Sequence, residues 1–226
     1  MLSQSVENFV KTVYRLQKPD EWVGTSRLAK ALGQRPASVT NMAQKLAKSE
    51  DGLITYQAYK GVKLTETGTS VALEVIRHHR LIELYLSKQL GVPWDKVHDE
   101  AEKLEHAISE KFEDRIAKAL GNPEIDPHGH LIPRKDGTMP ERSDCSLLKV
   151  EVGATTKVSK VSDRDPEMLR YLSDIGIKPG VDVELVERGP FDGPLMLRVD
   201  GAKKILALGT RVAAEIHVIA DSATGA

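Results

Sequence analysis

Apolar residues recur with helical spacing in the first part of the chain. The segments 5–16, 25–32 and 37–50 each place their apolar side chains on one face, which predicts three short amphipathic helices. Gly33 and Pro36 interrupt the pattern, as a glycine after one helix and a proline near the start of the next should. The second and third helices therefore form a predicted helix-turn-helix.

A β-hairpin is predicted directly after the third helix. Two runs that favour strands, 53–56 and 62–64, flank a turn that contains Lys60-Gly61. A hairpin in this place is the wing of a winged helix, whose second paired helix enters the major groove of DNA. We predict base contacts near the start of that helix and phosphate contacts from nearby lysines. The predicted base-contacting residues are Arg35, Ser38, Thr40 and Asn41, and the predicted phosphate-contacting residues are Lys45, Lys60 and Lys63.

Charge supports DNA binding by the front of the chain. The net charge of the 226 residues is −1, yet residues 1–77 carry 11 Lys and Arg against 7 Asp and Glu. This surplus is small, and a solvated helix face would also explain it, so the interpretation depends on the helix-turn-helix pattern.

Several classes of protein are excluded. No apolar run approaches the roughly 18 residues of a membrane span, and the first residues do not resemble a signal peptide, so we expect a cytoplasmic protein without membrane contact. The single cysteine, Cys145, excludes a disulfide or a cysteine-based zinc cage within the chain. A metal site would have to use histidines and carboxylates.

A long apolar helix is predicted over residues 70–92. It is too apolar for a lone surface helix, which suggests burial against a second copy of the chain in a homodimer. His79 and Glu83 are four residues apart and so lie on one face of this helix.

Potential metal ligands are concentrated in the segment HDEAEKLEH, residues 98–106. Helical spacing places Glu102, Glu105 and His106 on one face, and carboxylates with an imidazole suit a borderline-to-hard divalent metal ion. Two alternatives stay open at this point. One is a charged, solvated helix with ion pairs between its turns. The other is the His-Asp pair of a metal phosphohydrolase, which would require further ligands on several helices and no winged helix.

The last third of the chain alternates strand-like runs with Gly and Pro turns around one short helix, PEMLRYLSDIG. This pattern predicts a small SH3-like β-barrel. A segment rich in Pro, Gly and charge precedes it and is interpreted as a linker. The chain is thus predicted to be mainly α with small β parts. Its predicted domains are a winged helix at 1–70, a helical dimerisation and metal-binding domain at 71–122, a linker at 123–148 and an SH3-like domain at 149–220.

A winged helix followed by RHHRLIELYL, VHDEAEKLEH and PHGHLIP resembles the diphtheria-toxin-repressor family of metal-dependent transcriptional regulators, including its manganese-responsive branch. The resemblance covers essentially the whole chain. It implies a homodimeric regulator rather than an enzyme, which binds double-stranded operator DNA when it holds Mn²⁺ and represses metal-uptake genes. An iron-dependent regulator of the same architecture, using Fe²⁺, is the alternative, and other divalent ions are expected to substitute in vitro.

The resemblance also implies two neighbouring metal sites. Position 102 is cysteine in iron-type members and glutamate in manganese-type members, so Glu102 favours Mn²⁺. The C-terminal domain of some relatives lends oxygen ligands, for which Asp165 and Glu167 lie near the matching positions. The implied primary site comprises Asn8, Glu102, Glu105 and His106, and the implied ancillary site comprises His79, Glu83 and His98.

Two positions depart from the family pattern. Asn8 stands where well-known members have Met or Asp, and Lys11 stands where some manganese-type members have Glu. An amide oxygen can still bind a metal, but a protonated lysine repels a cation, so we expect the second ion at the ancillary site. His128 and His130 could also bind metal, but the resemblance places their loop between domains, and they are interpreted as linker residues.

Overall fold

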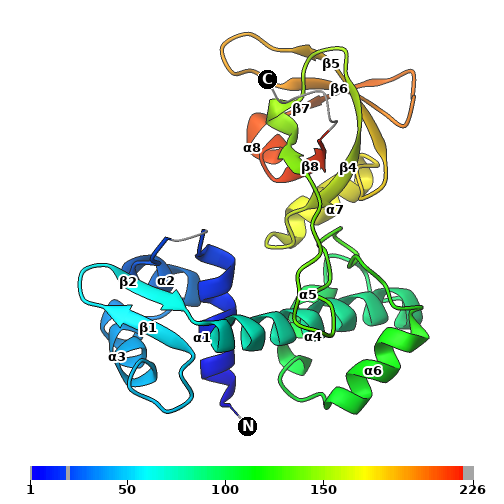
Figure 1. Cartoon of the computed structure of the whole chain (residues 1–226). Coiled ribbons are helices and arrows are strands. Elements are labelled where there is room, and N and C mark those ends of the chain that lie inside the picture. Colours follow the sequence, from blue (N-terminus) through cyan, green and yellow to red (C-terminus); the bar gives the residue numbers. More distant parts are fainter. Residues whose placement is uncertain (1, 19–20, 221–226) are drawn as a thin grey trace. The chain divides into compact units, whose positions relative to one another are not determined.

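The computed structural model describes residues 2–18 and 21–220, which form two compact units (Figure 1). The first unit holds the described residues up to His79 together with Leu104–Ile108 and Pro133–Met139. The second unit holds Arg80–Lys103, Ser109–Ile132 and the described residues from Pro140 onward. In the described part of the chain, no helix is both long enough and apolar enough to cross a membrane.

The first unit contains the predicted winged helix-turn-helix. Its elements are α1 (Gln4–Leu16), α2 (Thr25–Leu32), α3 (Pro36–Leu46), β1 (Ile54–Gln57) and β2 (Gly61–Leu64). The two strands pair antiparallel as the wing. The helices bury one apolar face each, and their shared core includes Phe9, Val10, Val13, Leu28, Val39 and Val62.

The turn between α2 and α3 has the predicted geometry. Gly33 adopts a left-handed conformation with a φ of 63°, and Pro36 occupies the first turn of α3. α3 ends at Leu46, four residues before the predicted end, where the Ser49 hydroxyl donates a hydrogen bond to the Leu46 carbonyl. This local bond satisfies a carbonyl at the helix end and replaces a further helical turn.

Three helices make up the helical part of the chain. α4 (Glu66–Leu90) matches the long predicted helix, α5 (Val97–Leu104) carries the first part of HDEAEKLEH, and α6 (Glu110–Ala119) follows. α5 begins at Val97, after a separate turn formed by residues 93–96. α5 also ends at Leu104, and Glu105 and His106 lie in the turn that follows it. The prediction that these two residues share a helical face with Glu102 is therefore wrong.

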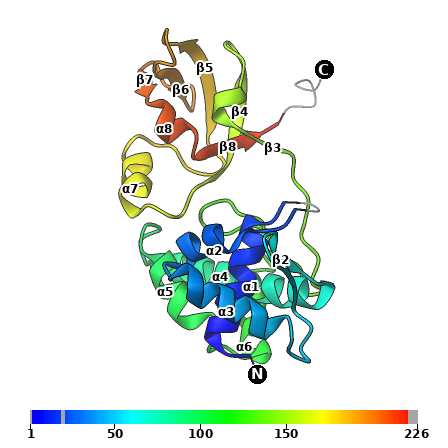
Figure 2. The ribbon, with the colours of Figure 1, turned by 90° about the vertical axis from the view of Figure 1, so that its left-hand side faces the viewer.

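The C-terminal part of the second unit is the predicted small β-structure. Its strands are β3 (Asp144–Ser146), β4 (Thr155–Val161), β5 (Asp182–Arg188), β6 (Leu195–Val199), β7 (Ile205–Leu208) and β8 (Ile216–Ile219). They form one antiparallel sheet in the order β3-β8-β4-β5-β6-β7 (Figure 2). A 3-10 turn at Leu147–Lys149, α7 (Pro166–Asp174) and α8 (Thr210–Ala213) complete the domain. Its core includes Val158, Leu169, Leu172, Leu185, Leu197 and Val218.

Candidate metal centre

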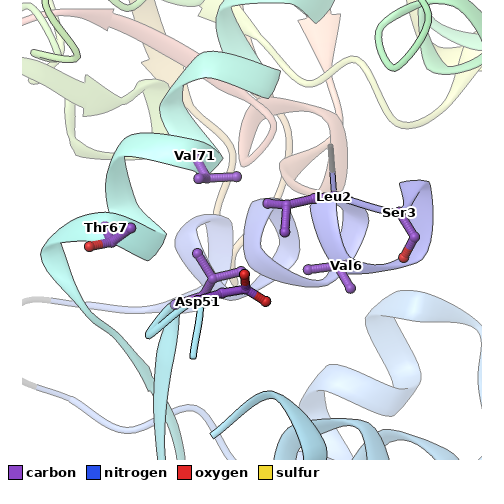
Figure 3. Close-up of a pocket in the computed structure, with 7 residues that line it drawn as sticks. Leu2, Ser3, Val6, Asp51, Thr67 and Val71 are labelled. Carbon is purple, nitrogen blue, oxygen red and sulfur yellow. The ribbon is translucent and has the colours of Figure 1, made fainter. Parts of the chain in front are cut away.

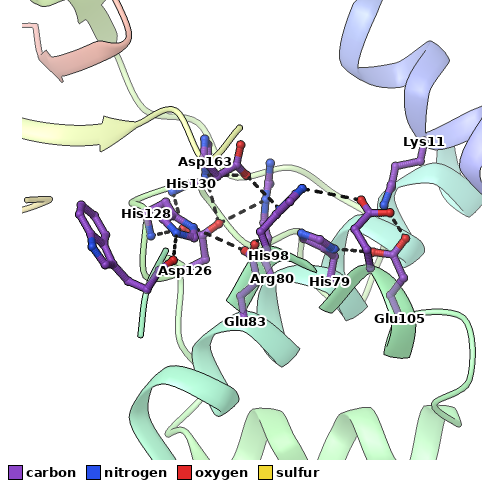
Figure 4. Close-up of polar contacts among 12 residues, drawn as sticks. Lys11, His79, Arg80, Glu83, His98, Glu105, Asp126, His128, His130 and Asp163 are labelled. Atoms are coloured by element: carbon purple, nitrogen blue, oxygen red, sulfur yellow. Dashed lines mark hydrogen bonds and ion pairs between the residues drawn. The ribbon is translucent and has the colours of Figure 1, made fainter. Parts of the chain in front are cut away.

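Glu105 lies at the centre of a buried cluster in the first unit. The turn after α5 carries it inward, and only 1% of its surface is exposed. It accepts hydrogen bonds from the Lys11 ammonium of α1 and from Nδ1 of His79 on α4 (Figure 4). Burial raises the pKa of Glu105, but hydrogen bonds and charges from His79 and Lys11 outweigh it and hold the pKa below its ordinary value. Glu105 is therefore a stable carboxylate despite its burial.

His106 joins α1 to the same cluster. Its Nε2 lies 3.0 Å from Asn8 Oδ1 and 3.1 Å from Glu105 Oε1, and its Nδ1 lies 2.5 Å from Glu7 Oε2. Three of the four residues predicted for the primary site thus come together. Ligand atoms about 2.1 Å from one ion lie about 3 Å apart at right angles, so these separations suit a shared divalent cation. The fourth, Glu102, is half-buried on α5, with its Oε1 4.0 Å from His98 Nε2.

A second cluster lies in the second unit around Glu83. Glu83 is fully buried, and its Oε1 lies 3.1 Å from His98 Nδ1. The carboxylate of Asp163, which follows β4, lies 3.8 Å from the same nitrogen. Glu83 and His98 are the two residues of the predicted ancillary site that belong to this unit. The third, His79, lies one turn before Glu83 on α4 and is hydrogen-bonded to Glu105.

Asp165 and Glu167, which the sequence suggests as ligands from the barrel, have other surroundings. The Asp165 carboxylate caps α7 by accepting hydrogen bonds from the backbone N–H groups of Glu167 and Met168. Glu167 is exposed in the first turn of that helix. Asp163, two residues earlier, is the barrel carboxylate that reaches His98.

The segment predicted as a linker contains a tightly bonded loop. Asp126 is 3% exposed, and its Oδ1 accepts hydrogen bonds from the backbone N–H groups of His128 and His130. Its second carboxylate oxygen lies 3.2 Å from His130 Nδ1. The Arg80 guanidinium donates to the Leu131 carbonyl and lies 3.8 Å from Asp126 Oδ2. Figure 4 shows these side chains converging on the loop. This loop, residues 126–130, is therefore a fixed element rather than a plain spacer.

The same loop is joined to the barrel strand β4. The Val161 N–H donates to the His128 carbonyl at 2.9 Å. Gly129 has a φ of 87°, and a Cβ atom there would collide with the Ser159 carbonyl oxygen. Only glycine fits this conformation and this approach. The pairing holds His128 at a fixed place beside the second cluster.

His128 is fully buried between charged and aromatic neighbours. Its ring stacks on Trp94 with centroids 5.7 Å apart, and its Nε2 lies 2.8 Å from the Trp94 carbonyl oxygen. Its Nδ1 lies 3.8 Å from Glu83 Oε2, which makes an ion pair rather than a hydrogen bond. Burial lowers the pKa of His128, but Glu83 and Asp126 outweigh it and raise the pKa to about 9.

A pocket of about 580 Å³ in the first unit lacks metal-binding character (Figure 3). It is lined by Leu2, Ser3, Val6, Asp51, Leu53, Thr67 and Val71. One carboxylate and no imidazole are too few ligands for a transition metal, so this pocket is a poor candidate beside the two clusters.

The residues predicted to contact DNA lie on α3 and on the wing. Most of them are exposed: Arg35, Ser38, Asn41, Lys45 and Lys60. Thr40 and Lys63 are half-buried. Their role in DNA binding stays a prediction.

Three residues of the clusters escaped sequence reasoning as site residues. Asp163 could have been preferred over Asp165, because an aspartate directly before a proline is a favoured helix cap. The only local signal at His128 is its spacing of two residues from His130, which does not by itself identify a site residue. The pairing of Lys11 with Glu105 joins residues 94 positions apart, and no local pattern indicates it.

Comparison with known proteins covers nearly the whole chain. The family model "Iron dependent repressor, N-terminal DNA binding domain" matches residues 1–62. "Iron dependent repressor, metal binding and dimerisation domain" matches residues 65–134, and "FeoA domain" matches residues 145–220.

Relatives and solved structures agree with these matches. The chain is 31% identical to the iron-dependent repressor IdeR of Mycobacterium tuberculosis strain H37Rv, over 85% of this chain and 87% of that protein. It is 29% identical to the diphtheria toxin repressor of Corynebacterium diphtheriae, over 88% and 91%. A solved manganese-dependent transcriptional repressor in complex with manganese superposes with a TM-score of 0.85 at 36% identity, over 96% of this chain and 100% of that one. The chain belongs to the diphtheria-toxin-repressor family of metal-dependent, DNA-binding transcriptional regulators.

Proposed function

We propose that the chain is a Mn²⁺-dependent repressor that binds operator DNA as a homodimer in the cytoplasm and controls metal-uptake genes. The observation that carries the proposal is the meeting of Asn8, Glu105 and His106 in one cluster. Their ligand atoms are two oxygens and a nitrogen, a set that suits Mn²⁺ better than softer thiolate-binding ions. The likeness to the superposed manganese-dependent repressor supports the same metal. Iron is the alternative, because IdeR is an iron-dependent repressor.

The donor set fits one ion in the first cluster better than two. Asn8, His106 and one oxygen of Glu105 have ligand-like separations, with Glu102 three residues before Glu105 as a further carboxylate. The Lys11 ammonium already neutralises Glu105, so a second cation beside it would meet direct repulsion. We propose that a second ion is held by Glu83, His98 and Asp163 in the other cluster.

α1 is the element through which metal binding would reach DNA. It carries Asn8 on one side, while Phe9, Val10 and Val13 pack in the core with Leu28 of α2 and Val39 of α3. When bound, Mn²⁺ supplies positive charge that draws Asn8 and His106 together. Any preferred position of α1 is then imposed on α3 through the shared core, because close-packed interiors transmit small shifts. Metal binding can shift the population toward the DNA-binding conformation only if that conformation has the higher affinity for the metal.

DNA contacts would come from the first turns of α3 and from the wing. Arg35, Ser38, Thr40 and Asn41 are proposed to reach base edges, and Lys45, Lys60 and Lys63 to hold phosphates. Two copies of this unit would read two half-sites of one operator.

The test is DNA binding measured by fluorescence anisotropy at one fixed salt concentration, because phosphate contacts make affinity steeply salt-dependent. Operator candidates are first selected from random duplexes in Mn²⁺. Affinity is expected to rise with Mn²⁺, to rise less with anaerobic Fe²⁺ and to collapse with a chelator. His106→Ala should lose the metal response, whereas His217→Ala, on β8 in the barrel, should keep it. Equal DNA affinity with and without metal would overturn the proposal.

A further inference from the structure

The turn at the tip of the wing carries a fully exposed tyrosine. Tyr59 lies between β1 and β2, and its exposed fraction of 108% means that no part of the described chain covers it. Its φ of 67° is a left-handed conformation, which glycine or asparagine adopts with less strain than tyrosine. The turn itself is closed by a backbone hydrogen bond from the Lys60 N–H to the Gln57 carbonyl. Neither packing nor turn geometry therefore accounts for an aromatic residue at this position.

The strand next to this turn has a fixed place in the first unit. β2 pairs with β1 on one side, and on the other side Val23 exchanges two backbone hydrogen bonds with Val62, at 2.8 and 2.9 Å. The Gln17 side chain, directly after α1, accepts a further hydrogen bond from the Leu64 N–H at 3.0 Å. Because the other end of β2 leads into α4, the turn points away from α4 (Figure 1). Tyr59 is thus presented to solvent on a rigid support.

The surroundings of Tyr59 favour a polyanion as its partner. Residues 53–65 contain two lysines and no aspartate or glutamate, and Lys60 is exposed beside the tyrosine. The other exposed residues of the wing are Thr55, Gln57 and Ala58, so the ring does not belong to a wide apolar patch of the kind that marks a protein interface. One aromatic ring between cationic and polar side chains suits the apolar sugar walls and charged phosphates of a nucleic acid.

The length of the wing matches the distance from one DNA groove to the next. Each of its two strands has four residues, which span about 13 Å. The major groove is about 12 Å wide, so a wing beside a helix in that groove extends to the adjoining phosphate ridge. The groove beyond the ridge is the minor groove. It is about 6 Å wide, which excludes a helix but admits one extended side chain.

We propose that Tyr59 enters the operator's minor groove beside each half-site and selects A·T over G·C pairs there. The inference rests on the proposed function, since it takes α3 as the helix in the major groove and Lys60 as a phosphate contact. A·T pairs present only acceptors in the minor groove, and the tyrosine hydroxyl can donate to them. The N2 amino group of guanine projects into the same groove and obstructs the ring.

The first test is the DNA affinity of wing variants. Wild type, Tyr59→Ala and Tyr59→Gly are compared in Mn²⁺ by fluorescence anisotropy, with the operator that wild type selects from random duplexes. Both variants should bind about tenfold more weakly, as for the loss of one base contact, although glycine also removes the backbone strain. Their affinity should depend on salt as steeply as that of wild type, because tyrosine is uncharged. Lys60→Gln should instead lower the slope of log affinity against log salt by about 1.

Phe191→Ala is the matched control for these variants. Phe191 is a 101% exposed aromatic residue with a φ of 56°, in the turn between β5 and β6 of the barrel. Phe191→Ala should bind operator as wild type does, and the thermal midpoints of all variants should show that they are folded. An equal loss of affinity in Phe191→Ala and Tyr59→Ala would contradict a contact specific to the wing.

The second test locates the tyrosine on the duplex. Each base pair that flanks a half-site is made A·T, G·C or inosine·C in turn. Inosine lacks the N2 amino group of guanine, so inosine·C has the major-groove edge of G·C and a minor groove like that of A·T. At one position beside each half-site, wild type should bind the G·C duplex more weakly and recover its affinity with inosine·C. Tyr59→Ala should bind the three duplexes equally.

The outcomes separate this inference from the function. If Tyr59→Ala binds operator as tightly as wild type, while Mn²⁺ still tightens binding by both, the inference fails and the proposed function stands. A wild type that binds G·C and inosine·C duplexes alike at every flanking position also overturns the inference. Equal DNA affinity of wild type with and without Mn²⁺ would overturn the proposed function, and the base substitutions would still decide the role of Tyr59.

Discussion

Lys11 is a buried ammonium in the place where a metal-binding cluster needs negative charge. Only 3% of its surface is exposed, and it is hydrogen-bonded to Glu105, whose other oxygen contacts His79. A buried ion pair contributes little net stability by itself, but removal of one partner leaves the other charge uncompensated. Lys11 therefore acts as an internal cation for Glu105 in the absence of metal.

Replacement of Lys11 by methionine tests this role. In chelator, Lys11→Met should lower the thermal midpoint, with a loss of up to about 3–5 kcal/mol for an uncompensated buried charge. Mn²⁺ should then stabilise the variant more than it stabilises wild type, because Glu105 is free to bind the ion. Differential scanning fluorimetry with and without Mn²⁺ measures both effects.

Lys18→Met, at an exposed position beyond the end of α1, is the matched control. Its thermal midpoint should equal that of wild type both with and without Mn²⁺. Equal stabilisation of wild type and Lys11→Met by Mn²⁺ would contradict the role of Lys11 as an internal cation.

At the scale of single elements, the loop at residues 126–130 depends on one glycine. Gly129 combines a positive φ with a close approach to the Ser159 carbonyl, so the loop can pair with β4 only when no side chain is present. The loop then pairs with Val161, two residues before Asp163, which is a proposed ligand of the second ion.

Gly129→Ala should displace the loop and weaken binding of the second ion by at least tenfold. The added Cβ is strained by about 1–2 kcal/mol in the left-handed conformation and also collides with backbone. Gly137→Ala is a well-matched control, because Gly137 has a φ of 79° but no atom within 4 Å of the added Cβ. Equilibrium dialysis with Mn²⁺ compares the two variants. If both variants lose Mn²⁺ affinity by the same factor, backbone strain explains the loss, and the close packing of Gly129 on β4 does not.

Element boundaries show how far sequence reasoning reaches. The helix-turn-helix was predictable because Gly33 and Pro36 are local signals, and the long helix because its apolar pattern extends over many turns. The end of α5 at Leu104 was not predictable from spacing. Glu105 turns inward to partners on α1 and α4, so a tertiary contact rather than local propensity sets that boundary. Asp163 and His128 escaped for the same reason, since their partner Glu83 is distant in sequence.

At the scale of the whole molecule, metal binding and DNA binding are two equilibria of one chain. If Mn²⁺ tightens operator binding by some factor, operator must tighten Mn²⁺ binding by the same factor. Isothermal titration of Mn²⁺ into the protein, alone and with saturating operator duplex, should give a ratio of metal affinities equal to the ratio of DNA affinities. A duplex of scrambled sequence is the control. Unequal ratios under identical salt would mean that a further equilibrium, such as dimer formation, carries part of the response.

The lysine at Glu105 also affects how the regulator would report on its surroundings. A metal ion leaves when its supply falls, but Lys11 is covalently part of the chain and cannot leave. Part of the positive charge that Glu105 receives is therefore constant, fixed by the gene and independent of the growth medium. If this cluster holds one exchangeable ion in place of two, as we propose, its occupancy would follow a simple saturation curve, and each protomer would respond gradually to manganese rather than at a sharp threshold.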